Sequence, residues 1–189
     1  MSRDKIIESG IQEFSKKGYF KGSMDTIAKN SGVAKGTLYY HFKNKAQLFE
    51  TILTEGIEFM IEEIEKTLND NISFKEQIKI IIEKNIALYL EHQELSRLFL
   101  NEISNGLDEE TVTNIKKLKH KYVSFLTYQL KDGYSYGLIK KNHFELTAYG
   151  ILGYIDSICS LYLDHPDQYL KEELIESVML FITNLIMEE

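Results

Sequence analysis

The feature that most constrains this chain is the stretch from Ser23 to Lys45, SMDTIAKNSGVAKGTLYYHFKNK. It predicts two short helices separated by a tight turn. Ser23 can cap a first helix over 24–30, because its hydroxyl accepts a backbone N–H of the first turn. Gly32 can adopt the left-handed conformation that ends a helix. A second helix is predicted over 35–42. This pattern is typical of a helix-turn-helix, whose second helix enters a DNA major groove.

The second of these helices has an apolar side and a polar side. Leu38 and Phe42 lie one helical turn apart and are expected to face the core. Lys35 and Thr37 are placed to contact base edges, whereas tyrosine hydroxyls and lysine ammonium groups suit phosphates. The candidate DNA-binding residues are Lys35, Gly36, Thr37, Tyr39, Tyr40, His41 and Lys45.

The first fifty residues also resemble the N-terminal signature of TetR/AcrR-type transcriptional regulators. The matching positions are Phe14, Gly18, Ile27-Ala28, Gly32-Val33, Gly36-Thr37-Leu38-Tyr39, Phe42, Lys45 and Leu48. The chain departs from the family at Ala34, where Ser or Thr is common, so the cap of the second helix is either absent or supplied by a neighbouring residue. The resemblance implies DNA contacts at the matching positions and a homodimer on a palindromic operator. It further implies a repressor that a small, mainly apolar or cationic effector releases from DNA. Activation by the same fold stays open.

Composition predicts a helical protein without disulfides or membrane spans. The 189 residues include one proline, no tryptophan and one cysteine, and 43% are hydrophobic. A lone Cys159 excludes an internal disulfide and fits a reducing cytosol. The charged N-terminus does not resemble a signal peptide, and no apolar run approaches eighteen residues. We therefore expect a cytoplasmic protein that does not contact a membrane.

Charge is distributed unevenly along the chain. The net charge is −7, which alone argues against a nucleic-acid partner. Residues 1–50, however, contain nine Lys or Arg against five acids, so this part carries +4 and the remainder −11. A basic region on an acidic chain is expected to face phosphate while the rest is repelled.

We expect an all-α protein of about nine helices in two domains. The first domain, residues 1–46, is a three-helix helix-turn-helix unit, and the second, 47–189, is a helical effector-binding and dimerisation domain. Three helices are expected to begin with a capping residue and a partner three positions on, at Asn44, Ser73 and Asn142. The predicted helices cover 3–18, 24–30, 35–42, 44–68, 73–91, 94–104, 108–136, 143–163 and 167–187.

The last two predicted helices are apolar on nearly every side. A helix of this kind must be buried on more than one face, and a chain of this size has too few other helices to cover two of them. A second copy of the chain can cover them, and Gly150 and Gly153 would allow close approach. We therefore predict a twofold dimer through a four-helix bundle.

The second domain is rich in aromatic residues, which suggests an effector cavity. Each of these residues is individually more typical of a core than of a binding site. Asp156 is unusual as a carboxylate within an apolar helix, where a charge is costly unless it is paired. Three roles stay open for it: a structural hydrogen bond to a tyrosine, a contact with the effector, or a place at the dimer interface. The candidate ligand-binding residues are Phe59, Tyr89, Phe99, Tyr122, Phe125, Tyr154 and Asp156.

Two other classes of protein fit the sequence less well. An enzyme is disfavoured, because no acid lies three residues before any histidine, as a bundle metal site requires, and no phosphate loop or nucleophile motif is present. No metal or cofactor is expected. A helical ligand-binding dimer that no longer binds DNA is the second alternative, and the basic N-terminal region argues against it.

Overall fold

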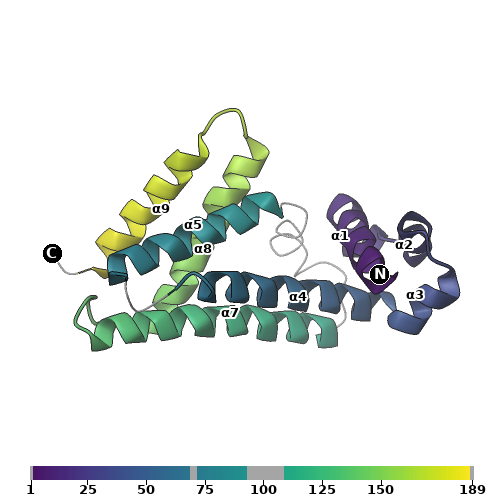
Figure 1. The fold of residues 1–189 in the computed structure, drawn as a ribbon, viewed down its shortest axis with the longest axis horizontal. Helices are drawn as coiled ribbons and strands as arrows, with labels where there is room; N and C mark the ends of the chain where they lie inside the picture. The colour runs from purple at the N-terminus through teal and green to yellow at the C-terminus, as the bar shows by residue number, and fades with distance from the viewer. Residues whose placement is uncertain (1, 69–71, 93–108, 188–189) are drawn as a thin grey trace. The chain divides into compact units, whose positions relative to one another are not determined.

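The computed structural model describes residues 2–68, 72–92 and 109–187, and these residues are almost entirely helical. Residues Ile139 and Met187 form an isolated antiparallel bridge. The all-α prediction is confirmed, and the helix predicted over 94–104 lies outside the described residues. The helices of the described ranges are α1 (Ser2–Lys21), α2 (Met24–Ser31), α3 (Lys35–His41), α4 (Lys45–Glu65), α5 (Phe74–Glu91), α7 (Glu109–Ser135), α8 (Phe144–Asp164) and α9 (Lys171–Ile186) (Figure 1).

The chain forms two compact units that do not follow a single division of the sequence. One contains Met1–Glu58 with His92–Leu118, and the other contains Phe59–Glu91 with Lys119–Glu189. Each unit therefore takes part of α4 and part of α7. The domain boundary predicted between residues 46 and 47 stays a prediction.

The short N-terminal helices begin and end where local chemistry predicts. Ser23 is extended, and its hydroxyl accepts the Thr26 N–H at 3.5 Å. Gly32 ends α2 with φ 68°, in the left-handed region that a side chain would disfavour. Ala34 precedes α3 without a side-chain cap, so of the two alternatives the structure shows the absent cap. The helical conformation of α1 breaks at Gly18 (φ 74°, ψ 165°), where the sequence predicted that the helix ends, and a short second helical piece follows the kink to Lys21.

The first unit is held together by a core of interlocking aromatic and aliphatic side chains. Phe14 meets Phe49 edge-on, with ring centroids 5.3 Å apart, and Tyr19 lies 4.8 Å from Phe49. Ile27 of α2 and Leu38 of α3 are fully buried in the same cluster. This core fixes α3 against α1 and leaves its other side in solvent.

Of the two helix caps that the sequence predicted for the second unit, one is present and the other is not. The Ser73 hydroxyl accepts the Glu76 N–H at 3.2 Å, so the predicted cap of α5 is present. The predicted cap at Asn142 is wrong: its amide donates to Lys140 O and its oxygen accepts the Thr147 hydroxyl. Both side-chain groups are thus used outside the cap, and α8 begins two residues later than Asn142.

The face of α8 and α9 that a single chain leaves uncovered is rich in large apolar side chains. Helices α5, α8 and α9 pack against one another and bury one side of each. The exposed large residues of α8 and α9 are Leu146, Tyr149, Leu161, Leu180, Phe181 and Leu185. By length and composition alone, α8 could also cross a membrane, which is weak evidence, since core helices of folded bundles pass the same test.

Candidate nucleic-acid interface and effector cavity

Helix α3 separates its residues into a buried side and an exposed side. Leu38 is fully buried, whereas 84% of Tyr40 and 47% of Tyr39 are exposed. Lys35 and Gly36 are exposed, and Thr37 and His41 are half-buried. Six of the seven candidate DNA-binding residues therefore lie within one short helix whose polar side is open to a partner.

Neighbouring side chains hold both ends of α3. At its start, Lys35 Nζ lies 2.7 Å from Asp25 Oδ2 of α2. At its end, His41 Nε2 lies 3.1 Å from the Ser2 hydroxyl. These contacts are on the surface and orient the candidate residues without burying them.

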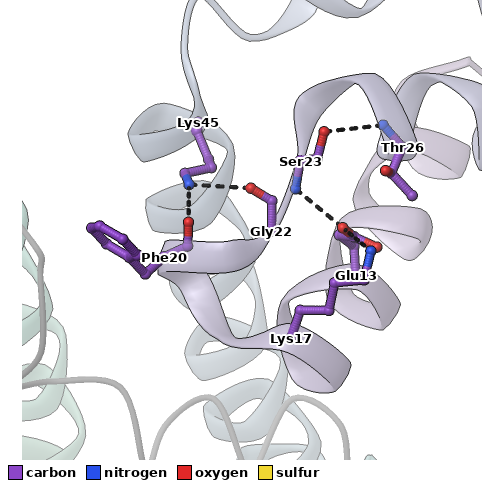
Figure 2. Close-up of polar contacts among 7 residues, drawn as sticks. All are labelled: Glu13, Lys17, Phe20, Gly22, Ser23, Thr26 and Lys45. Atoms are coloured by element: carbon purple, nitrogen blue, oxygen red, sulfur yellow. Dashed lines mark hydrogen bonds and ion pairs between the residues drawn. The ribbon is translucent and has the colours of Figure 1, made fainter.

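Lys45, the seventh candidate, has a structural role that the sequence did not predict. Its ammonium donates to Phe20 O at 3.0 Å and Gly22 O at 3.1 Å, as Figure 2 shows. The same ammonium lies 4.6 Å from the centre of the Tyr19 ring. Lys45 therefore ties the start of α4 to the end of α1, and its contact with a phosphate stays a prediction.

Glu13 is a buried carboxylate that sequence reasoning missed. Its Oε1 accepts the Ser23 N–H at 3.1 Å and pairs with Lys17 Nζ at 2.9 Å (Figure 2). Only 5% of Glu13 is exposed. The available signal was its place directly before Phe14 in the apolar pattern of α1. Glu13 links α1 to the first residues of α2 and so helps to place the helix-turn-helix.

A partly open cavity lies among α5, α7, α8 and α9, and its space, counted together with the solvent at its opening, is about 510 Å³. Its lining is chiefly aliphatic, with three neutral amides and no charged side chain. The lining residues are Phe74, Gln77, Ile78, Ile81, Ile82, Asn85, Leu126, Gln129, Leu130, Ile151, Ile155, Ile182 and Ile186. Such a space suits an apolar group with few polar contacts.

The described aromatic candidates lie around this cavity or away from it, not in its lining. Tyr122 is buried and donates its hydroxyl to Asn85 Oδ1, and Phe125 stacks on Tyr122 with 6.1 Å between ring centroids. Tyr89 is buried, and 42% of Phe59 is exposed.

Tyr154 stacks on Phe181 at 4.1 Å, between α8 and α9, and its hydroxyl lies 3.1 Å from the Ser177 hydroxyl. Phe99 lies outside the described residues. None of the described aromatic candidates is in the lining, whose described aromatic residue is Phe74 of α5, a residue that was not predicted from the sequence.

Asp156 lies in α8 in a largely apolar setting. Burial raises the pKa of its carboxyl from 3.8 to about 6, although nearby Lys119 acts in the opposite direction. Burial, together with the smaller effect of the Asp156 charge, raises the pKa of Cys159 to about 12. Within the described ranges, no group of three or more His, Cys, Asp or Glu residues is placed to hold a metal ion.

Comparison with known proteins identifies both parts of the chain. Residues 6–52 match the family model of bacterial regulatory proteins of the tetR family. Residues 71–162 match the model of the tetracyclin repressor-like C-terminal domain. The uncharacterized HTH-type transcriptional regulator YhgD of Bacillus subtilis is 30% identical over 164 residues, covering 85% of this chain and 84% of YhgD.

Two further relatives indicate what proteins of this kind do. The biofilm operon icaADBC negative transcriptional regulator IcaR of Staphylococcus epidermidis is 26% identical, covering 79% of this chain and 96% of IcaR. The structure of the transcriptional regulator FadR from Bacillus subtilis in complex with stearoyl-CoA is 26% identical, with a TM-score of 0.85. It covers 95% of this chain and 96% of FadR. The chain belongs to the TetR family of bacterial regulatory proteins and is a helix-turn-helix DNA-binding transcriptional regulator.

Proposed function

We propose that the protein is a homodimeric repressor that leaves its operator when an effector with a hydrocarbon chain occupies the cavity. The observation that carries this proposal is α3, a helix with one side locked in an aromatic core and the other side polar and open. Repression, rather than activation, is supported by the relative IcaR, which is named a negative regulator. A regulator of this kind acts on chromosomal DNA, so we place it in the cytoplasm.

The proposed DNA contacts divide into two kinds. Lys35, Gly36 and Thr37 lie at the start of α3, where a recognition helix meets base edges. Tyr39, Tyr40 and His41 follow, with hydroxyl and imidazole groups that suit phosphate oxygens. The spare N–H of Lys45 and the backbone amides at the start of α4 are the proposed further phosphate contacts.

The proposed dimer uses the exposed apolar face of α8 and α9. Leu180 is 64% exposed and Leu146 is 69% exposed in a single chain. Gly150 and Gly153 lie on the same helix, and a methyl group added at either would meet no atom within 4 Å, so the backbone of α8 is open to close approach. Packing two copies together would cover these side chains in a four-helix bundle.

The proposed effector carries a hydrocarbon chain. Seven isoleucines line the cavity, and the polar groups that reach it are neutral amides. A cationic effector is the alternative that the sequence left open, but it would find no carboxylate partner in this lining. The stearoyl-CoA in the FadR structure supports acyl thioesters as the first compounds to test.

Release from DNA is proposed to follow from a change in the spacing of the two α3 helices. Two recognition helices must lie about 34–36 Å apart to enter successive major grooves. An effector that binds better to a dimer with another spacing shifts the population away from the DNA-binding form. The effector and the operator then weaken each other's binding by the same factor.

Fluorescence anisotropy with the duplex upstream of the protein's own gene tests the proposal. We expect tight binding to this duplex relative to a scrambled duplex, and weaker binding when stearoyl-CoA or a shorter acyl-CoA is added. Equal binding to both duplexes would contradict the operator role. Specific binding that no acyl-CoA or free fatty acid changes would contradict the effector role.

A further inference from the structure

The cavity runs along two antiparallel helices that meet at two identifiable points. Near one end, Gly133 of α7 lies against the ring of Phe74 in α5. Near the other, the Tyr122 hydroxyl of α7 donates to Asn85 of α5. From Phe74 to Asn85, and from Tyr122 to Gly133, each helix advances by the same eleven residues, roughly 16 Å. Phe74 and Asn85 are also the first and last residues of α5 in the cavity lining.

The Phe74 end is formed by an aromatic ring resting directly on a helix backbone. Gly133 is buried, and a methyl group in place of its hydrogen would overlap three atoms of the Phe74 ring. Only a residue without a side chain therefore allows the ring to take this position.

The last turn of α9 lies at the same end of the cavity. Ile186 lines the space, and its carbonyl accepts the Lys140 N–H at 2.7 Å, shortly after the end of α7. The Leu138 N–H bonds Gly133 O at 3.0 Å. The chain segment after α7 is thus pinned both to Gly133 and to the end of α9, so the wall around Phe74 is supported from two helices.

We propose that Phe74, seated on Gly133, is the specificity-determining residue that sets the longest hydrocarbon chain the cavity accepts. This inference rests on the proposed effector site and names the feature of the effector that the site measures. A ring at the end of an aliphatic space excludes further methylene groups, because a packed interior tolerates little overlap. A smaller residue at position 74 should lengthen the space that a hydrocarbon chain can occupy, and a larger ring should shorten it.

The experiment measures binding of the full-length protein to two matched series of compounds. One series is acyl-CoA thioesters of eight to eighteen carbons, and the other is free fatty acids of the same lengths. Affinities are measured by calorimetry for the natural protein and for Phe74→Ala, Phe74→Leu and Phe74→Trp. Tyr128→Ala is the control, since it removes an aromatic ring from α7 that is 65% exposed and does not line the cavity.

We expect Phe74→Ala to move the preferred chain length upward and to improve binding of the longest chains by about tenfold or more, within the range that one methylene can contribute. Phe74→Trp should move the preference downward, and Phe74→Leu should lie between Phe74→Ala and the natural protein. Tyr128→Ala should leave the preference unchanged. The same change in preferred chain length is expected in whichever of the two series the natural protein binds.

Three results would overturn the inference. If folded Phe74 variants keep the natural length preference, or if they weaken all lengths equally, Phe74 is a structural residue and the proposed function still stands. If no compound of either series binds the natural protein, the proposed effector site fails and this inference fails with it. Thermal melting of each variant separates misfolding from altered preference, and Phe74→Leu retains the test if Phe74→Ala does not fold.

Discussion

The helix-turn-helix region (residues 6–52) and the cavity region (α5, α8, α9 and residues 119–135 of α7) fill their interiors differently. In the first, Phe14, Tyr19 and Phe49 interlock, with ring centroids 4.8 to 5.9 Å apart. In the second, seven isoleucines line a partly open cavity. The first region has ring-to-ring geometry that fixes one arrangement, whereas the second has branched aliphatic chains around a gap.

This difference matches the two tasks proposed for the chain. A helix that inserts into a groove must keep one position, so the packing behind it is tight and its ends are tied by side chains. A region that admits an effector must leave room, and unfilled space weakens packing. Substitutions in the two regions should therefore act through different physical causes.

The largest effect is expected from breaking the aromatic core. Phe14→Ala removes a fully buried ring that contacts Tyr19 and Phe49, and should lower the free energy of unfolding by about 3–5 kcal/mol. Phe20→Ala removes the same side-chain atoms from a residue that is 71% exposed and should cost little. Urea unfolding followed by circular dichroism measures both. Equal losses would show that packing is not what distinguishes this region.

The next effect concerns the exposed face of the cavity region. Gly153→Arg places a long charged side chain where a single chain has open space, so the fold should be kept and pairing blocked. We expect self-association to weaken by about hundredfold, close to 3 kcal/mol. Sedimentation equilibrium measures the association. If Gly153→Arg dimerised with the same dissociation constant as the natural protein, the dimer interface would lie elsewhere.

A pH-dependent effect is expected from Asp156. Because burial raises its pKa from 3.8 to about 6, the folded protein retains a proton that the unfolded chain releases over that range. Stability should therefore fall as the pH rises from about 4 to 6 and then stay level.

Asp156→Asn removes this charge and should raise the free energy of unfolding at pH 7.5 by about 1–3 kcal/mol. Urea unfolding at pH 4.5, 5.5 and 7.5 compares the two proteins. If the stability of Asp156→Asn depended on pH in the same way as that of the natural protein, the pH dependence would not come from the Asp156 carboxyl.

The smallest effect is expected at the recognition face. Tyr40 is 84% exposed, so Tyr40→Phe should leave stability unchanged. If its hydroxyl binds phosphate, affinity for every duplex should fall by about 0.5–1.5 kcal/mol, the contribution of one hydrogen bond. Anisotropy titrations on the operator and on a scrambled duplex measure this loss. A loss confined to the operator would instead indicate a base contact.

The sequence correctly predicted helix ends that depend only on residues close together in the chain. Ser23 caps α2 and Gly32 ends it, because each requires only its own side chain, or the lack of one, and a nearby backbone group. It failed at Asn142, whose amide and oxygen found partners in Lys140 and Thr147 that compete with a cap. Gly18 breaks the helical conformation of α1, as the sequence predicted, but the short helical piece that follows the kink was not predicted.

The cavity could not be predicted from the count of aromatic residues. Its lining depends on which faces of four helices meet, and that is set by contacts between residues far apart in the chain. One signal was present: Phe74, Ile78, Ile81, Ile82 and Asn85 recur at the spacing of one face of α5. The contact of Gly133 with Phe74, by contrast, joins residues of two helices and has no signature in either segment alone.

Selection of binding sequences from random duplex DNA tests the central claim most directly, since it makes no assumption about the operator sequence. If two α3 helices of a dimer enter successive major grooves, the enriched sequences should contain an inverted repeat with half-site centres about 34–36 Å apart. Enrichment of a single half-site without a repeat, or of no sequence at all, would contradict the account.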